Sequence, residues 1–304
     1  VPGHASLPTE ADPSDPQSYA IFKGKDYASD RINEQALAFI KDNKDRPFFL
    51  YYPTLIPHVA LHVPDEELKP YLKLNWYDPP FTREQGYGYT PHFNPRAAYA
   101  AMISRMDQYV GNVISLVEQL GLTRDTIVIF TSDHGEMLGD HGMLYKGCRF
   151  FEGLVHVPLI IRWPGVTKPN TKTDALVELI DLAPTILEAT GVDIPYNMQG
   201  RSLFDLLSGA TKTHKPHVVS EFNGALAGMP NQSHGTMVFD GRYKTCMYHD
   251  VGKAEIFDLH EDPGEFTSLW DKPGFEKDQI RLLKQHLDAV MQTSDAGIER
   301  TGMY

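Results

Sequence analysis

Apolar residues recur with a helical period in four parts of the chain. In the clearest part, residues 95–120, apolar side chains return every three or four positions, and Gly121 follows as a stop signal. The same period predicts a helix over residues 30–42. Two further helices are expected, a short one over residues 181–190 and a longer one over residues 274–293.

Short runs of β-branched and apolar residues predict strands between these helices. Residues 126–130 and 159–162 are apolar almost throughout, which is typical of strands buried on both faces of a parallel sheet. Residues 48–52 form a third apolar run, bounded by prolines, and are expected to be another buried strand. Strands that alternate with helices indicate the α/β class with a mainly parallel sheet and flanking helices.

The pattern changes after residue 212. A small antiparallel sheet is predicted by four short strand-like runs, residues 218–222, 236–239, 243–247 and 256–259. Asp240 and Gly241, a dipeptide typical of tight hairpin turns, lie between the second and third of these runs. We therefore expect two domains, an α/β part over residues 1–212 and a small α+β subdomain with one helix over residues 213–304.

The segment 53–94 is rich in Pro, Tyr and His and has little periodicity. An irregular stretch of this length inside a compact domain is usually functional. We expect residues 57–92, together with residues 222–234, to wall a pocket.

Charge and composition exclude some partners. The chain has 28 Lys and Arg against 40 Asp and Glu, a net charge of −12, which argues against attraction of the whole surface to nucleic acid or anionic lipid. A local pocket can still bind an anion. No apolar run approaches the ~20 residues needed to span a bilayer. Cys148 and Cys246 do not make a disulfide framework, and we expect buried thiols.

A candidate metal site lies where the strand at 126–130 ends. Asp133 and His134 follow that strand directly, and ligands of open α/β sheets bind beyond the carboxyl ends of strands. A carboxylate and an imidazole can both ligate a divalent cation, although two ligands are too few for a complete site. Taken alone, a turn capped by the aspartate explains the pair slightly better.

Lys146 follows within one loop, after Gly139-Asp140-His141-Gly142. A lysine close to a metal supplies positive charge for a tetrahedral oxyanion such as sulfate or phosphate. In isolation Lys146 is better explained as a solvated loop residue. His141 lies near enough to border a site, and a role in shaping the loop explains it equally well.

These motifs together resemble the sulfatase family of the alkaline-phosphatase-like superfamily. The matching elements stand in the order that the family shows, at residues 47–58, 131–136, 139–142, Lys146, Glu152, 156–160, 163–165, 181–187, 200–203 and 256–265. The resemblance implies an alkaline-phosphatase-like fold and a calcium ion with Asp133 and His134 among its ligands. It also implies that Lys146 and His58 are catalytic and contact the sulfate ester, His58 as a proton donor to the leaving group, with His141 beside the substrate.

The resemblance further implies an element that the sequence does not contain. Sulfatases carry their nucleophile in a Cys- or Ser-x-Pro/Ala-x-Arg element whose first residue is oxidised to formylglycine, and neither Cys148, Cys246 nor any serine fits it. The adjacent aspartates that complete the calcium site are absent too. Both elements precede residues 48–58 in the family. We therefore expect a fragment, inactive alone, whose missing N-terminal segment would be its partner and whose sheet edges and apolar faces are exposed.

The function that this resemblance implies is calcium-dependent sulfuric ester hydrolysis, with release of sulfate from a sulfated sugar or an aryl sulfate. Two alternatives stay open. One is a phosphonate monoester or phosphodiester hydrolase of the same superfamily, and the other is a non-catalytic fragment that binds sulfated glycans. The family's habit implies a periplasmic, secreted or lysosomal location.

Two other groups of polar residues are weaker candidates. His62 stands four residues after His58, but the neighbouring prolines oppose the helix that a two-histidine metal site would need. Arg242, Tyr243 and Lys244 are either pocket residues or the exposed face of a hairpin strand, and we expect the second.

Overall fold

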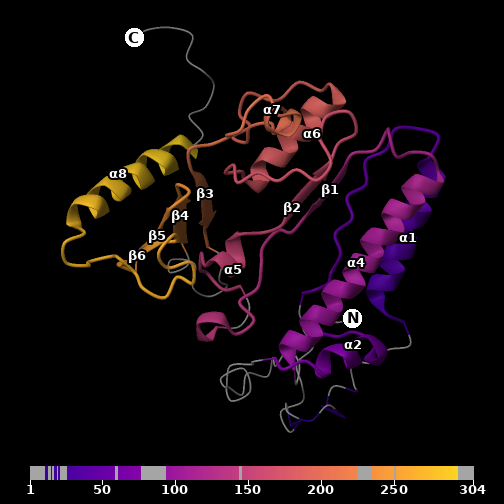
Figure 1. Cartoon of the computed structure of the whole chain (residues 1–304), viewed down its shortest axis with the longest axis horizontal. Helices are drawn as coiled ribbons and strands as arrows, with labels where there is room; N and C mark the ends of the chain where they lie inside the picture. Colours follow the sequence, from indigo (N-terminus) through magenta and orange to yellow (C-terminus); the bar gives the residue numbers. More distant parts are fainter. Residues whose placement is uncertain are drawn as a thin grey trace. The chain divides into compact units, whose positions relative to one another are not determined.

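A computed structural model describes residues 11–12, 15, 17–18, 20, 26–58, 61–76, 94–143, 146–224, 234–249 and 251–293. Its residues divide into two compact units, 1–126 with 137–145, and 127–136 with 146–304. Each unit is described by itself, and Figure 1 labels their elements. The domain boundary expected at residue 212 falls inside the second unit and stays a prediction.

The described part of the first unit is helical. It contains α1 (Ala28–Asn43), α2 (Asp65–Leu72) and α4 (Pro95–Gln119), and α4 confirms the helix predicted over residues 95–120. The Asn94 side chain accepts a hydrogen bond from the Ala97 backbone N–H at 3.2 Å, and Pro95 occupies the first turn, so the start of α4 is capped. The buried face of α4 packs into an apolar core with Ile56, Leu61 and Leu68.

Helix α2 corrects the expectation that residues 53–94 have no regular structure. It begins after Pro64. The negative charges of Asp65, Glu66 and Glu67 in its first turn stabilise it by interacting with the positive end of the helix dipole. Its Leu68 reaches the core against α4. Of the expected pocket wall, residues 59–60, 77–92 and 225–233 lie outside the described residues.

The strand predicted over residues 48–52 is wrong for the described part of the chain. These residues form no strand, and Phe49 and Tyr51 are 70% and 77% exposed. Phe48 packs edge-on against Phe39 at 6.0 Å. An extended segment becomes a strand only when a neighbour pairs with its backbone groups, and the described residues supply none.

Strands β1 (Val128–Thr131) and β2 (Leu159–Arg162) begin the second unit, at the predicted positions. They pair antiparallel, with Val128 opposite Arg162, and so correct the parallel arrangement expected for these two runs. Continuous apolar runs are common in parallel sheets, but the run does not fix strand direction, and here Ile160 of β2 is 65% exposed. The described part of the connection between them contains only short helices, η2 (Asp140–Gly142) and α5 (Glu152–Val155).

A helical segment follows β2, and the loop that contains Arg201 is hydrogen-bonded to it. Its elements are η3 (Leu179–Asp181), α6 (Leu182–Thr190) and α7 (Phe204–Ser208). Gly191 ends α6 in a left-handed conformation with φ of 69°, as the sequence predicts. The fully buried Asp181 accepts the Arg201 N–H at 2.8 Å and pairs with Lys215 at 2.7 Å, which ties the loop to this segment.

The small C-terminal sheet is confirmed. Its strands are β3 (Val218–Phe222), β4 (His234–Phe239), β5 (Tyr243–His249) and β6 (Lys253–Asp258), antiparallel in the order β3-β4-β5-β6. The predicted turn between β4 and β5 has Gly241 at φ of 96°. Helix α8 (Glu276–Thr293) lies along this sheet (Figure 1) and buries Leu282, His286 and Ala289. Both cysteines are free thiols, and only Cys246 is buried.

Candidate active site

The loop after β1 is held against α5 by two backbone hydrogen bonds. Gly135 donates to the Leu154 carbonyl at 2.8 Å, and Glu136 donates to the Gly153 carbonyl at 3.0 Å. A Cβ atom on Gly135 would lie 1.9 Å from the Gly153 oxygen, so the close approach requires glycine there. The two residues before Gly135 are thereby held beside the short helix α5.

His134 is oriented by two hydrogen bonds, in which one ring nitrogen donates and the other accepts. Its Nδ1 lies 2.8 Å from the Gly135 carbonyl oxygen, which can only accept, so Nδ1 carries the proton. The Nε2 lone pair then accepts from the Lys146 ammonium at 2.9 Å. The imidazole therefore turns its basic nitrogen toward a cation, the orientation that metal-ligating histidines need.

Asp133 presents its carboxylate to the same edge of the imidazole. Its Oδ1 accepts the His134 backbone N–H at 3.0 Å, and its Oδ2 lies 3.6 Å from His134 Nε2. The Asp133 side chain is 86% exposed, so it can exchange water for a ligand without losing a buried partner.

This pair fits calcium as part of a site. Calcium binds its ligands at about 2.3–2.6 Å, so two ligands of one ion can stand up to about 5 Å apart, and the 3.6 Å between Asp133 Oδ2 and His134 Nε2 is within that limit. Calcium usually takes about 6–8 ligands. Within the described ranges no group of three or more His, Cys, Asp or Glu gathers at metal-binding spacing, so Asp133 and His134 would supply only part of such a coordination sphere.

The structure brings Asp133, His134 and Lys146 together in the second unit. His58 and His141 belong to the first unit, and their place beside the substrate stays a prediction. His58 is exposed and closes a turn by donating its backbone N–H to Leu55 at 3.0 Å. His141 has a positive φ of 54°, between two glycines that also have positive φ. Such conformations are costly for a residue with a Cβ and often mark functional loops.

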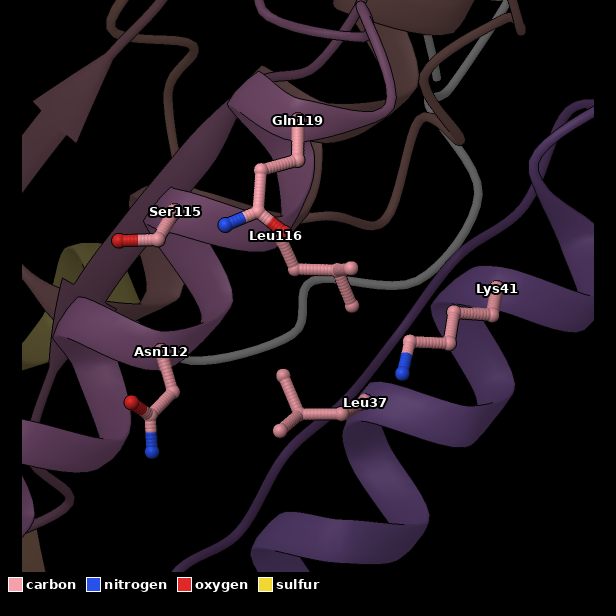
Figure 2. Close-up of a pocket in the computed structure, with 6 residues that line it drawn as sticks. All are labelled: Leu37, Lys41, Asn112, Ser115, Leu116 and Gln119. Atoms are coloured by element: carbon pink, nitrogen blue, oxygen red, sulfur yellow. The ribbon is translucent and has the colours of Figure 1, made fainter.

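A hollow of about 320 Å³ between α1 and α4 contains none of these residues. Figure 2 shows Leu37 and Leu116 directed toward one another across it, with Lys41 on α1 and the polar side chains on α4. Its lining is Leu37, Lys41, Asn112, Ser115, Leu116 and Gln119. It has neither a carboxylate nor an imidazole, so it does not serve the chemistry that the motifs indicate.

The sequence-based expectation for Lys244 is wrong. Lys244 is 1% exposed, and its Nζ donates to Glu152 Oε1 at 2.5 Å and Glu265 Oε1 at 2.7 Å. Burial opposes ionisation of Glu152, yet the hydrogen bond and charge of Lys244 hold the pKa of that carboxyl below its ordinary value. Arg242 follows the expectation, exposed and paired with Asp258 at 2.7 Å. Glu152 and Glu265, which both lie within the family motifs, were the sequence signal for a buried lysine, because buried carboxylates need a cation.

Two family models match the chain. One is described as Sulfatase and matches residues 5–192, and the other is described as N-sulphoglucosamine sulphohydrolase, C-terminal, and matches residues 139–293. Arylsulfatase K of Mus musculus is 38% identical over 185 residues, which cover 58% of this chain and 32% of that protein. An arylsulfatase of Clostridium perfringens is 26% identical over 286 residues, 88% of this chain and 58% of the relative. The chain thus spans only part of the length of these relatives.

Solved structures share the fold. A phosphonate monoester hydrolase from Silicibacter pomeroyi superposes with a TM-score of 0.78 at 26% identity, covering 90% of this chain and 61% of that one. A protein solved with its substrate D-glucosamine-2-N,6-O-disulfate has a TM-score of 0.77 at 20% identity, covering 92% and 72%. These likenesses confirm the α/β, alkaline-phosphatase-like fold. No helix in the described part combines the length and apolar character that crossing a membrane demands.

Proposed function

The chain belongs to the sulfatase family, and from this premise we propose that the protein is a calcium-dependent sulfuric ester hydrolase. The observation that carries the proposal is the group formed by Asp133, His134 and Lys146, with His134 Nε2 within 3.6 Å of a carboxylate oxygen and 2.9 Å of an ammonium. This group combines two ligands for a hard cation with a positive charge for an oxyanion.

Each residue has a distinct task in this proposal. Asp133 and His134 would hold calcium, which when bound supplies positive charge against the sulfate oxygens. Lys146 would bind a sulfate oxygen or the bridging oxygen of the ester. His58 would protonate the leaving group, and His141 would border the substrate. The formylglycine nucleophile has no counterpart among residues 1–304, so the proposal includes its supply from outside this sequence.

The substrate class proposed is a sulfated sugar, with aryl sulfates as the convenient assay substrate. The match to the C-terminal model of N-sulphoglucosamine sulphohydrolase and the neighbour solved with D-glucosamine-2-N,6-O-disulfate support this choice. A periplasmic, secreted or lysosomal location forms part of the same proposal. The described ranges 57–58, 61–76 and 222–224 contain part of the expected pocket wall, and the rest lies outside the described residues.

A second function is phosphonate monoester hydrolysis. The phosphonate monoester hydrolase from Silicibacter pomeroyi, at 26% identity and a TM-score of 0.78, favours it specifically. Sulfate and phosphonate monoesters both present a tetrahedral anionic centre to the same cationic groups. The relative rates on matched aryl esters therefore separate the two functions.

The test uses the complete polypeptide as it is encoded. Release of nitrophenol from p-nitrophenyl sulfate and from p-nitrophenyl phenylphosphonate is measured with calcium and after its removal by a chelator. We expect calcium-dependent turnover that is faster on the sulfate, and at least about a 100-fold loss of kcat/KM in Asp133→Asn.

Asp107→Asn is the matched control, since Asp107 is exposed on α4 and serves no proposed role. Faster turnover of the phosphonate would replace the first proposal with the second. No turnover of either ester, with binding of a sulfated glycan that Asp133→Asn leaves intact, would indicate a binding protein.

A further inference from the structure

Lys244 on β5 is a saturated buried cation. Its ammonium has three donors, and the structure provides three acceptors, namely Glu152 Oε1, Glu265 Oε1 and the Phe150 carbonyl at 3.0 Å. Lys244 is 1% exposed and the Glu265 side chain 2%. Such clusters gain little net stability over apolar side chains of the same shape, because desolvation offsets the attraction. The geometry they impose is the better explanation for their presence here.

The cluster fixes both the backbone and the side chain of Glu152. The Glu152 backbone N–H donates to Glu265 Oε2 at 2.6 Å, while its carboxylate accepts from Lys244. Glu152 is the first residue of α5, which has only four residues and cannot hold its orientation by helix formation alone. The contacts of Glu152 with Lys244 and Glu265 therefore orient the start of α5, together with the buried Phe150 and Phe151 that precede it.

Helix α5 in turn holds the loop of the candidate site. The carbonyls of Gly153 and Leu154 accept the N–H groups of Glu136 and Gly135. Gly135 also supplies the carbonyl that fixes the tautomer of His134. Hydrogen bonds and the covalent backbone of α5 and Gly135 thus connect Lys244 to the imidazole.

We propose that Lys244 is a positioning residue that sets the orientation of Asp133 and His134 through Glu152 and α5. The functional part of this inference rests on the proposed calcium-dependent activity. Lys244 touches neither ligand, so its effect is on calcium affinity and on the geometry of the loop.

The test compares Lys244→Met with the double variant Lys244→Met/Glu265→Gln in the complete polypeptide. Lys244→Met alone leaves two carboxylates without their cation and is expected to fold poorly. In the double variant the buried side chain at position 265 is a neutral amide, whose oxygen can still accept the Glu152 backbone N–H. The Glu152 side chain is 31% exposed, so water can solvate it, and it keeps His156 as a partner at 2.8 Å. Arg242→Met is the matched control, because Arg242 precedes Lys244 by two residues and pairs with Asp258 away from α5.

Three measurements are made, namely the amide hydrogen exchange of Gly135 and Glu136, the calcium affinity by titration calorimetry, and kcat and KM on the aryl sulfate. We expect the folded double variant to exchange these amides at least about 10-fold faster and to bind calcium about 10–100-fold more weakly, and Arg242→Met to change neither. Unchanged exchange overturns the proposal. Faster exchange with unchanged calcium affinity, kcat and KM also overturns it, since the cluster would then only anchor the sheet. If the wild type binds no calcium and cleaves no ester, the proposed function fails, and the exchange comparison alone decides whether Lys244 positions the loop.

Discussion

The two units each contain an ion network, and the networks differ in how far water reaches them. In the first unit Arg105 of α4 pairs with Asp30 of α1 at 2.5 Å and with Glu67 of α2, and the Arg105 side chain is 20% exposed. In the second unit Lys244 pairs with Glu152 and Glu265 at 1% exposure. Water can replace a lost partner in the first network but not at Glu265 in the second, so the same loss of a cation should cost more there.

The buried network also orients a helix, whereas the exposed network does not. Arg105 joins α4 to α1 and α2, and the apolar faces of α2 and α4 already share a core through Leu68 and Met102. Helix α5, which Glu152 begins, has four residues and buries only Leu154. Where packing already determines an orientation, an ion pair adds little. At α5 the buried Phe150 and Phe151 directly precede the helix, and the ion cluster additionally holds Glu152 where the helix begins.

The largest expected effect is that of Lys244→Met. Removal of one partner from a buried ion cluster leaves uncompensated charge and costs about 3–5 kcal/mol of unfolding free energy. Urea unfolding measures it, with Lys284→Met as the counterpart in the same unit, because Lys284 and its partner Asp288 are both exposed. A loss below about 1 kcal/mol would mean that water reaches Glu265 and that the contrast between the networks is false.

Gly135→Ala tests the contact between the candidate-site loop and α5. The new Cβ would lie 1.9 Å from the Gly153 oxygen, so the backbone must move, at an expected cost of about 3 kcal/mol. Gly111→Ala is the control, because nothing lies within 4 Å of its added Cβ and it stands inside α4. That substitution should stabilise by about 0.5–1 kcal/mol. Equal effects of the two changes in thermal unfolding would contradict the close approach.

The pH dependence of stability tests a buried histidine of the second unit, His286. Burial, then the nearby His249, lowers the pKa of His286 to about 4, and its Nε2 lies 2.8 Å from Thr236 Oγ1. Because this folded-state pKa lies below the ordinary value of 6.5, protons bind the unfolded chain first, and stability present above pH 6.5 falls as the pH drops toward 4.

The expected loss from this group is about 2–3 kcal/mol. Urea unfolding of the wild type and of His286→Gln at several pH values measures it. The variant should show a shallower slope in this window. An identical slope would assign the acid sensitivity to other groups.

The smallest effect is expected for Arg105→Met. Asp30 and Glu67 can turn to water, and Tyr109 still donates to Asp30 Oδ1 at 2.6 Å, so the loss should be about 1–2 kcal/mol. A loss as large as that of Lys244→Met, measured in the same urea series, would show that exposure does not distinguish the two networks.

Much of the local structure was predictable from the sequence, for identifiable reasons. The helix at α4 begins at Asn94-Pro95 and the hairpin turns at Asp240-Gly241, and both depend on residues whose conformational preferences act within a few positions. Asp133 and His134 were found for the same reason, since they are neighbours that directly follow a strand. Their proposed metal role stays a prediction.

The misinterpretations all concern partners that are distant in the sequence. Strand direction at β1 and β2 depends on which segment pairs with which, and residues 48–52 have no strand partner among the described residues. Helix α2 was missed because its apolar contribution to the core is the single buried Leu68, too little for a periodic signal.

The sequence by itself determined the family, the order of most elements and the identity of the candidate ligands, because these follow from short-range patterns. Only the tertiary structure decided that Nε2 of His134 faces Lys146 at 2.9 Å and that Lys244 is buried between two glutamates far from it in the chain. Burial and hydrogen bonding depend on what the rest of the chain places around a side chain. A lysine in an alternating strand has the same local sequence signature whether it meets water or carboxylates.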